Sequence, residues 1–156
     1  MKRHASDASH AGRSAVTPLP CACANLRRAA RLVTQLYDQE LRRAGMRATQ
    51  FTLLQALATA PNISQGILGR VLGLDSTTLT RELALLRRKD WIQSKQGKDR
   101  RTLQLTLTAE GRRKYQHARP YWLSAQKRLR RSLGNVHWSR ALEMMIRTAE
   151  RAQALA

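Results

Sequence analysis

The chain has 156 residues, a length that suits one domain with a core of its own. Its 29 lysines and arginines outnumber 10 aspartates and glutamates, which gives a formal net charge of +19. This surplus favours a polyanionic partner, nucleic acid first and an acidic membrane surface second. Because no apolar run is long enough to span a bilayer and no signal-peptide core follows Lys2 and Arg3, we expect a cytoplasmic protein with reduced cysteines.

The chain opens with a segment that has no helical or strand periodicity. Residues 1–20 end in Pro18 and Pro20, which predicts a flexible basic arm before a folded domain at 21–156. From residue 21 apolar positions step by three and four up to Gly45, which predicts a helix over about 22–44. A second helix is predicted from Thr49 to Thr59.

Two short helices joined by a glycine follow. Ser64 is a suitable N-cap, and one face of the next turns carries Ile67, Leu68, Val71 and Leu72. Gly73 interrupts this helix, and Asp75 or Ser76 caps the following one, from Ser76 to Arg87, which buries Leu79, Leu83 and Leu86. Two such helices predict a helix-turn-helix.

A β-hairpin is predicted directly after these helices. Trp91 to Lys95 reads as a strand, 96–101 as a polar turn with a glycine, and Thr102 to Thr106 alternates with period two. A hairpin in this place is a wing, here Gln93 to Gln104, so we expect a winged helix-turn-helix over about 49–106. The expected fold class is therefore mainly α with a small β-hairpin.

The last fifty residues predict two helices within 108–155, the first starting at Thr108. Each carries an apolar stripe, one through Trp122 and one through Trp138, for which the chain offers no large partner. Such stripes are usually buried in a dimer, so we expect a homodimer.

Four stretches, taken in order, resemble the MarR family of winged helix-turn-helix regulators. They are Thr49–Leu54, Leu72–Arg81, Asp99–Arg101 followed by Leu107–Gly111, and Pro120–Trp122 with Ala125–Gln126. The likeness covers about residues 23–155. It implies a homodimer, a repressor rather than an enzyme, with one recognition helix per subunit in successive major grooves of a palindromic double-stranded operator and the wings on the minor groove.

The residue chemistry agrees with DNA recognition. Side chains off the buried leucine face of the recognition helix can reach DNA, namely Ser76, Thr77, Thr80 and Arg81. An arginine reads guanine through two hydrogen bonds, and hydroxyls suit phosphates or base edges. The resemblance implies that Arg101 enters the minor groove and Asp99 orients it, with phosphate contacts from Lys95, Lys98 and Arg100. Relatives often carry a basic residue at the place of Ser76, so the operator sequence does not transfer.

Two hypotheses concern the signal that relieves DNA binding. The first is a small aromatic or apolar acid effector in the family's cleft between the first two helices and the fifth, lined by Tyr37, Phe51, Tyr121 and Trp122. Ordinary core packing explains the same aromatic residues equally simply. With this switch, Cys23 is a small buried hydrophobic residue.

The alternative is oxidation of Cys23. This residue falls in the first turn of the first helix, where free N–H groups and the helix dipole favour a thiolate. The resemblance aligns it with the cysteine of hydroperoxide-sensing members, implies that Tyr37 bonds the sulfur, and leaves Cys21 or a small thiol to resolve a sulfenic acid. Arg27 and Ala48 stand where those sensors have further tyrosines.

Other classes are less favoured. The Lys127–Arg131 cluster suits a non-specific architectural DNA-binding protein, and the tryptophan-bearing basic helices suit a membrane surface. Cys21 and Cys23 with His4 and His10 match no usual zinc spacing, so we expect no metal, and no motif indicates a cofactor or an enzyme.

Overall fold

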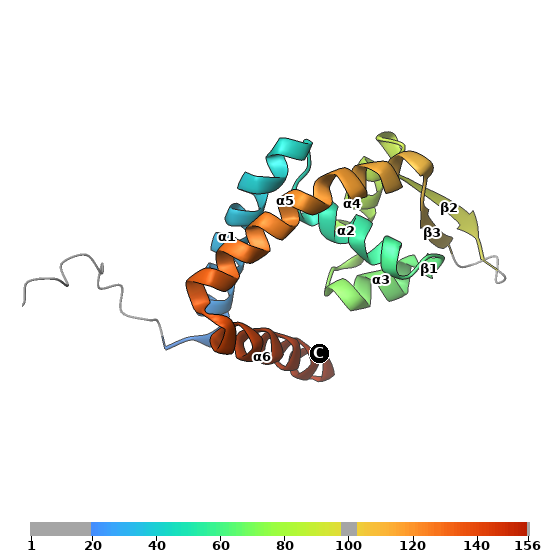
Figure 1. The fold of residues 1–156 in the computed structure, drawn as a ribbon. Coiled ribbons are helices and arrows are strands. Elements are labelled where there is room, and N and C mark those ends of the chain that lie inside the picture. Colours follow the sequence, from blue (N-terminus) through green and yellow to red (C-terminus); the bar gives the residue numbers. More distant parts are fainter. Residues whose placement is uncertain (1–19, 98–102, 156) are drawn as a thin grey trace, which may run out of the picture. The chain divides into compact units, whose positions relative to one another are not determined.

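The computed structural model describes residues 20–97 and 103–155 (Figure 1). The elements, in chain order, are α1 (Ala22–Leu41), the short 3-10 helix η1 (Arg42–Ala44), α2 (Ala48–Thr59), β1 (Ile63–Ser64), α3 (Gln65–Leu72), α4 (Ser76–Arg88), β2 (Ile92–Gln96), β3 (Leu103–Leu107), α5 (Ala109–Leu133) and α6 (Asn135–Ala154). The predicted fold class, mainly α with a small hairpin, is confirmed.

The chain divides into two compact units, residues 1–32 and 33–156. The described part of the first unit consists mainly of the opening turns of α1, whose side chains are largely exposed. All other elements belong to the second unit. Nearly all of the predicted arm lies outside the described residues, so the arm stays a prediction. Within 20–97 and 103–155, no helix is long and apolar enough to cross a membrane.

The core of the second unit is built around α2. The Phe51 side chain is 1% exposed, and its ring centroid lies 5.3 Å from that of Tyr115 and 5.6 Å from that of Trp122, both on α5. Other fully buried side chains come from the end of α1, from α2, α3 and α4, and from β3: Leu41, Leu53, Leu54, Leu57, Leu68, Leu83, Leu86 and Leu105. Aromatic stacking therefore joins the first half of the winged module to the long helix that follows it.

A half-buried ion pair adds a second connection to α5. Glu40 is 6% exposed, and its carboxylate lies 2.5 Å from the Arg128 guanidinium. The Arg43 guanidinium lies 3.8 Å from the same carboxylate. The hydrogen bond from Arg128 lowers the pKa of Glu40 below its ordinary value. The end of α1 is thus held against the C-terminal third of α5 by charge as well as by apolar packing.

The predicted face of α3 is only half right. Leu68 is fully buried and Leu72 is half-buried, but Ile67 and Val71 are 45% and 67% exposed. Residues in a helix advance by about 100° each, so positions 68 and 72 share a direction from which 67 and 71 are turned away. A helix of eight residues that packs along one side buries only the narrower set.

The sheet has the order β1-β3-β2 and is antiparallel throughout. Leu105 of β3 is fully buried and pairs with Ile63 on one side and Ser94 on the other. The predicted hairpin is present; β2 starts one residue later than expected, and the described part of the second strand runs from Leu103 to Leu107. β1 was not predicted, because two residues are too few to show periodicity. Since β1 directly precedes α3, the wing is hydrogen-bonded to the helix-turn-helix.

The last two helices expose most of their apolar side chains. α5 runs without interruption through Pro120 and buries Ala118 and Ala125. Among its described residues α6 has none that is buried, and its large exposed apolar side chains are Val136, Leu142, Met144, Met145 and Ile146. On the predicted C-terminal stripe Trp138 is half-buried, whereas Leu142 and Met145, one and two turns further along the same face, are exposed in the single chain.

Candidate nucleic-acid interface

The turn between α3 and α4 depends on two glycines. Gly73 ends α3 with φ +61°, a left-handed conformation that side chains disfavour. At Gly69 an added Cβ would lie 3.3 Å from both the Leu74 carbonyl oxygen and the Leu79 side chain. The two helices consequently cross in close contact, which sets the direction of α4.

Asp75 fixes the first turn of α4. Its Oδ1 accepts a hydrogen bond of 2.9 Å from the Thr78 backbone N–H, and its Oδ2 accepts one of 2.7 Å from the Thr78 hydroxyl. These bonds lower the pKa of Asp75, so the carboxylate is charged at neutral pH. Of the two predicted caps, Asp75 is the one used, and the Ser76 hydroxyl is left for other contacts.

The exposed face of α4 carries the predicted DNA-contacting side chains. Leu79, Leu83 and Leu86 are at most 2% exposed, as expected from their spacing. The opposite face presents four exposed polar residues, Ser76, Thr77, Thr80 and Arg81. This face joins hydroxyl groups and a guanidinium over the first two turns, a combination that can bind phosphates and base edges.

Gln65 belongs to the same surface and was missed by the sequence reasoning. Its side-chain amide donates a 3.0 Å hydrogen bond to the Thr80 hydroxyl oxygen. The bond leaves the Thr80 hydroxyl free to donate to a ligand. The sequence offered one clue to Gln65, namely its position directly after Ser64, the N-cap of α3. The Ser64 hydroxyl accepts a 3.3 Å hydrogen bond from Ile67 N–H.

The wing is tied to the end of α4. The Arg87 side chain donates a 3.0 Å hydrogen bond to the Ser94 hydroxyl on β2. Lys95 of the same strand is exposed and pairs with Gln104 of β3. The predicted contacts at the wing tip, Lys98, Asp99, Arg100 and Arg101, lie outside the described residues and stay predictions.

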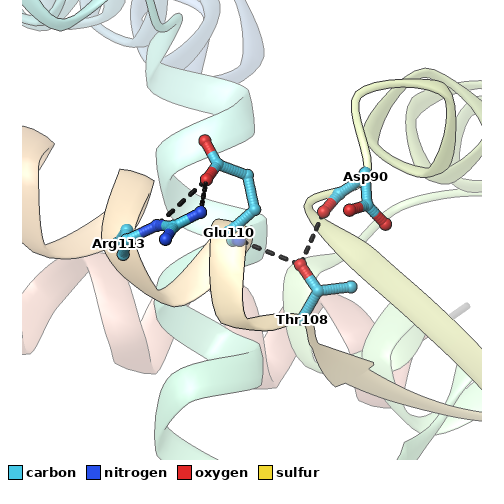
Figure 2. Close-up of polar contacts among 5 residues, drawn as sticks. Asp90, Thr108, Glu110 and Arg113 are labelled. Carbon is cyan, nitrogen blue, oxygen red and sulfur yellow. Dashed lines mark hydrogen bonds and ion pairs between the residues drawn. The ribbon is translucent and has the colours of Figure 1, made fainter.

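A polar junction joins the base of the wing to α5 (Figure 2). The Thr108 hydroxyl donates to the Asp90 carbonyl oxygen at 2.5 Å and accepts from the Gly111 backbone N–H at 2.9 Å. Thr108 N–H donates to the Trp91 carbonyl oxygen at 3.1 Å. Arg113 forms an ion pair with Glu110 one turn along α5. Thr108 is therefore both the cap of α5 and the anchor of the hairpin.

Gly111 permits this junction to close. A Cβ built there would lie 1.8 Å from the Trp91 carbonyl oxygen, far inside contact distance. Only glycine allows the first turn of α5 to approach the chain so closely. The sequence gives no signal for this contact, because it joins residues 20 positions apart through the backbone alone.

The candidate sensor residues are accessible. Cys21 and Cys23 are free and exposed, and Cys23 lies in the first turn of α1 as predicted. In the single chain the Cys23 side chain is exposed. Tyr37 is half-buried, and burial raises the pKa of its hydroxyl.

The aromatic residues of the predicted effector cleft pack in or on the core. Phe51 stacks on Trp122 with an angle of 19° between the rings, and Tyr121 contacts His117 edge-on at 5.9 Å. For Phe51, core packing accounts for its place fully. A ligand cleft at these residues stays a prediction. In the described part of the chain, no three His, Cys, Asp or Glu side chains gather as a metal site; His4 and His10 lie outside it.

In this chain a helix-turn-helix, α3 and α4, is followed by a hairpin, β2 and β3, and β3 also pairs with β1, the strand before α3. This arrangement defines a winged helix-turn-helix protein. The MarR family model matches residues 44–102, which include the helix-turn-helix and most of the wing. The chain belongs to the MarR family of transcriptional regulators.

Individual relatives agree with this assignment. The transcriptional regulator MosR of M. tuberculosis, solved in complex with DNA, is 35% identical with a TM-score of 0.79, and the match covers 86% of this chain and 98% of MosR. The HTH-type regulator YwoH of Bacillus subtilis is 27% identical over 104 residues, 67% of this chain and 76% of YwoH. MarR of E. coli shares the fold at 21% identity, with a TM-score of 0.67 and coverage of 84% and 98%.

Proposed function

We propose that this regulator binds a palindromic operator in double-stranded DNA as a homodimer and represses transcription. The observation that carries the proposal is the exposed set Ser76, Thr77, Thr80 and Arg81 on α4, opposite a fully buried leucine face. The DNA complex of MosR, at 35% identity, supports it. A location in the cytoplasm and the absence of an enzymatic step belong to the same proposal.

In this mechanism α4 enters the major groove and the wing follows the backbone. The Arg81 guanidinium reads guanine, while the hydroxyls near the start of α4 bind phosphates or base edges. Lys95 reaches a phosphate from β2. At the wing tip Lys98 and Arg100 add phosphate contacts, and Arg101, oriented by Asp99, enters the narrow minor groove where negative potential is concentrated.

The homodimer is supported by apolar side chains that the single chain leaves in water. Val136, Met144 and Ile146 of α6 are each more than half exposed, and Leu32 of α1 is 53% exposed. Exposed apolar groups in such numbers are costly unless a partner covers them. A two-fold dimer would also place two copies of α4 on successive half-sites.

The test compares promoter DNA of the protein's own gene with random duplex by fluorescence anisotropy at two salt concentrations. Arg81→Ala should weaken binding to the promoter by about 1–3 kcal/mol, or roughly five- to 150-fold, and change binding to random duplex little. Arg131→Ala, an exposed arginine on α5, is the control and should change both alike. Coincident curves for promoter and random DNA at physiological salt would refute sequence-specific binding.

An architectural DNA-binding protein is the second candidate, motivated by the Lys127–Arg131 cluster. The structure weakens this motive, because Arg128 is paired with Glu40 and Arg130 donates to the Asn135 side chain at 2.8 Å. Two of the four cations in that cluster are therefore engaged within the chain.

We further propose that a small aromatic or apolar acid releases the regulator from DNA. Half-buried Tyr37, Tyr121 and Trp122, with arginines nearby in sequence, support a ligand of that class. Titration of the operator complex with benzoate, followed by anisotropy, tests the class directly. Release by benzoate that is lost in Trp122→Ala is the expected result; no release by any aromatic acid contradicts it.

Oxidation is the alternative switch, supported by the exposed thiol of Cys23 in the first turn of α1. A hydroperoxide would transfer one oxygen to the Cys23 thiol as its O–O bond breaks, giving a sulfenic acid and an alcohol. The thiol of Cys21, or a small cellular thiol, would then attack the sulfur to form a disulfide and release water. Peroxide should release operator DNA from the native protein and not from Cys23→Ser; release that persists in the variant rejects this switch.

A further inference from the structure

We propose that a basic hollow beside η1 is a binding site for a small organic or inorganic anion. The hollow has a volume of about 720 Å³ and is formed by the end of α1, the segment before α2 and the end of α4. Its charged lining consists of Arg42, Arg47, Lys89 and Asp38. Its volume falls in the range of small-molecule sites, about 300–1,000 Å³.

The cations of this hollow lack acidic partners. Arg42, Arg47 and Lys89 are exposed, and among the residues that the structure describes no carboxylate forms an ion pair with any of them. Asp38 is the one acidic residue in the lining. Its Oδ1 already accepts a 2.6 Å hydrogen bond from Ala48 N–H at the start of α2, so its charge is directed at the helix N-terminus.

The backbone around η1 and a ring contact of Lys89 shape this lining. Gly45 turns the chain with φ +66°, and Met46 N–H donates to the Leu41 carbonyl oxygen at 3.2 Å, so η1 and the start of α2 are fixed relative to each other. The Lys89 ammonium lies 4.5 Å from the centre of the Trp91 ring. This contact orients the lysine and leaves its three donors for a ligand.

The floor of the hollow limits what fits. Met46 is 3% and Gln50 4% exposed, so an apolar and an amide side chain lie beneath the ring of cations. Gln50 Oε1 accepts from Arg47 N–H at 3.1 Å, which fixes the amide. Carboxylate or phosphate groups suit the rim, because charge-assisted hydrogen bonds to arginine and lysine are strong. The shared chemistry is therefore that of a small anion with at least two charged oxygens.

The hollow is separate from the proposed DNA surface. Lys89 follows the last turn of α4, whereas Ser76 begins it, about 20 Å away along the helix axis at 1.5 Å per residue. An anion that bridges Arg42 or Arg47 to Lys89 would join the end of α1 to the end of the recognition helix. It would thereby change DNA affinity, a consequence that rests on the proposed function, whereas the anion site itself does not.

Isothermal titration of the full chain with inorganic pyrophosphate and, separately, citrate tests the site without DNA. We expect one anion per chain and a loss of at least about tenfold in affinity in Arg42→Gln or Lys89→Gln, since a hydrogen bond to a charged group contributes about 1.5–3 kcal/mol. Arg88→Gln is the matched control, because it removes the same charge from an exposed neighbour outside the hollow. It should change affinity less than twofold.

Three results would overturn the proposal. The first is that neither probe binds. The second is equal weakening in Arg88→Gln, which would indicate diffuse attraction by the net charge. The third is that Arg42→Gln, with no probe present, lowers operator affinity as much as Arg81→Ala does. The last would make the hollow a DNA phosphate contact. Urea unfolding of each variant verifies that it folds. Since the titration contains no DNA, failure of the anion site leaves the DNA-binding proposal untouched.

Discussion

At Gly111 the first turn of α5 comes against the Trp91 carbonyl, and no side chain can be accommodated without movement of backbone. Gly111→Ala should lower the free energy of unfolding by about 1–3 kcal/mol, the usual cost of forcing extra atoms into a packed site. Urea denaturation followed by circular dichroism measures the change.

Gly66→Ala provides the control for that substitution. Gly66 lies in α3 with ordinary helical backbone and open space within 4 Å of an added Cβ. Alanine there should be neutral or stabilise by up to about 1 kcal/mol through helix propensity. Equal effects of the two alanines would contradict the close contact at Gly111.

At the same scale, individual side chains show what a sequence can and cannot reveal. Ser64 was predicted as a cap, Asp75 as one of two candidates, and Thr108 as a helix start, because such residues act on backbone within three positions. The bond from Gln65 to Thr80 and the approach of Gly111 to Trp91 join residues distant in sequence, so no local pattern announces them. The wing-tip residues stay predictions from the resemblance.

Among the elements, the recognition helix has a cap whose charge can be titrated. Hydrogen bonds from Thr78 lower the pKa of Asp75 in the folded protein, so the cap contributes stability above the unfolded value, about 3.9. That contribution is lost as the pH falls through the lowered pKa.

Asp75→Asn should remove this pH dependence while it keeps a side-chain cap. The difference in unfolding free energy between the native protein and the variant should therefore be larger at pH 7 than at pH 3, as measured by urea titrations at both values. Glu82→Gln, on the same helix and with no described ion pair, is the control. A difference that does not change with pH would refute a charged cap.

The long helices and the two hairpin strands were predicted, whereas the packed face of α3 and the two-residue strand β1 were not. The spacing of Leu79, Leu83 and Leu86 identified the buried side of α4, because a helix of 13 residues repeats its pattern enough to be read. In α3 more apolar residues were predicted on the buried face than pack against the core. The strand β1 is too short to show an alternation of apolar and polar residues. Tertiary contacts decided both cases.

For the whole molecule, the uncovered face of α6 predicts the oligomeric state. Met145→Glu should convert a dimer to a monomer in size-exclusion chromatography with light scattering, because a charge would replace a side chain that the partner buries. Arg151→Gln makes the same change in charge on an exposed residue of α6 and should leave the dimer intact. A monomeric native protein, or a dimeric Met145→Glu, would contradict the proposed interface.

The place of β3 in the middle of its sheet has a consequence for hydrogen exchange. Gln104 and Leu105 face partner strands on both sides, and Asn62 N–H donates to the Leu105 carbonyl oxygen at 3.1 Å. Backbone amides at this level should exchange with deuterated solvent only when a large part of the unit opens, whereas amides of Gln96 and Leu103, paired on one side, should exchange through local fraying. The wing thus has a slowly exchanging base that the helix-turn-helix protects and a rapidly exchanging outer part that can adjust to its target.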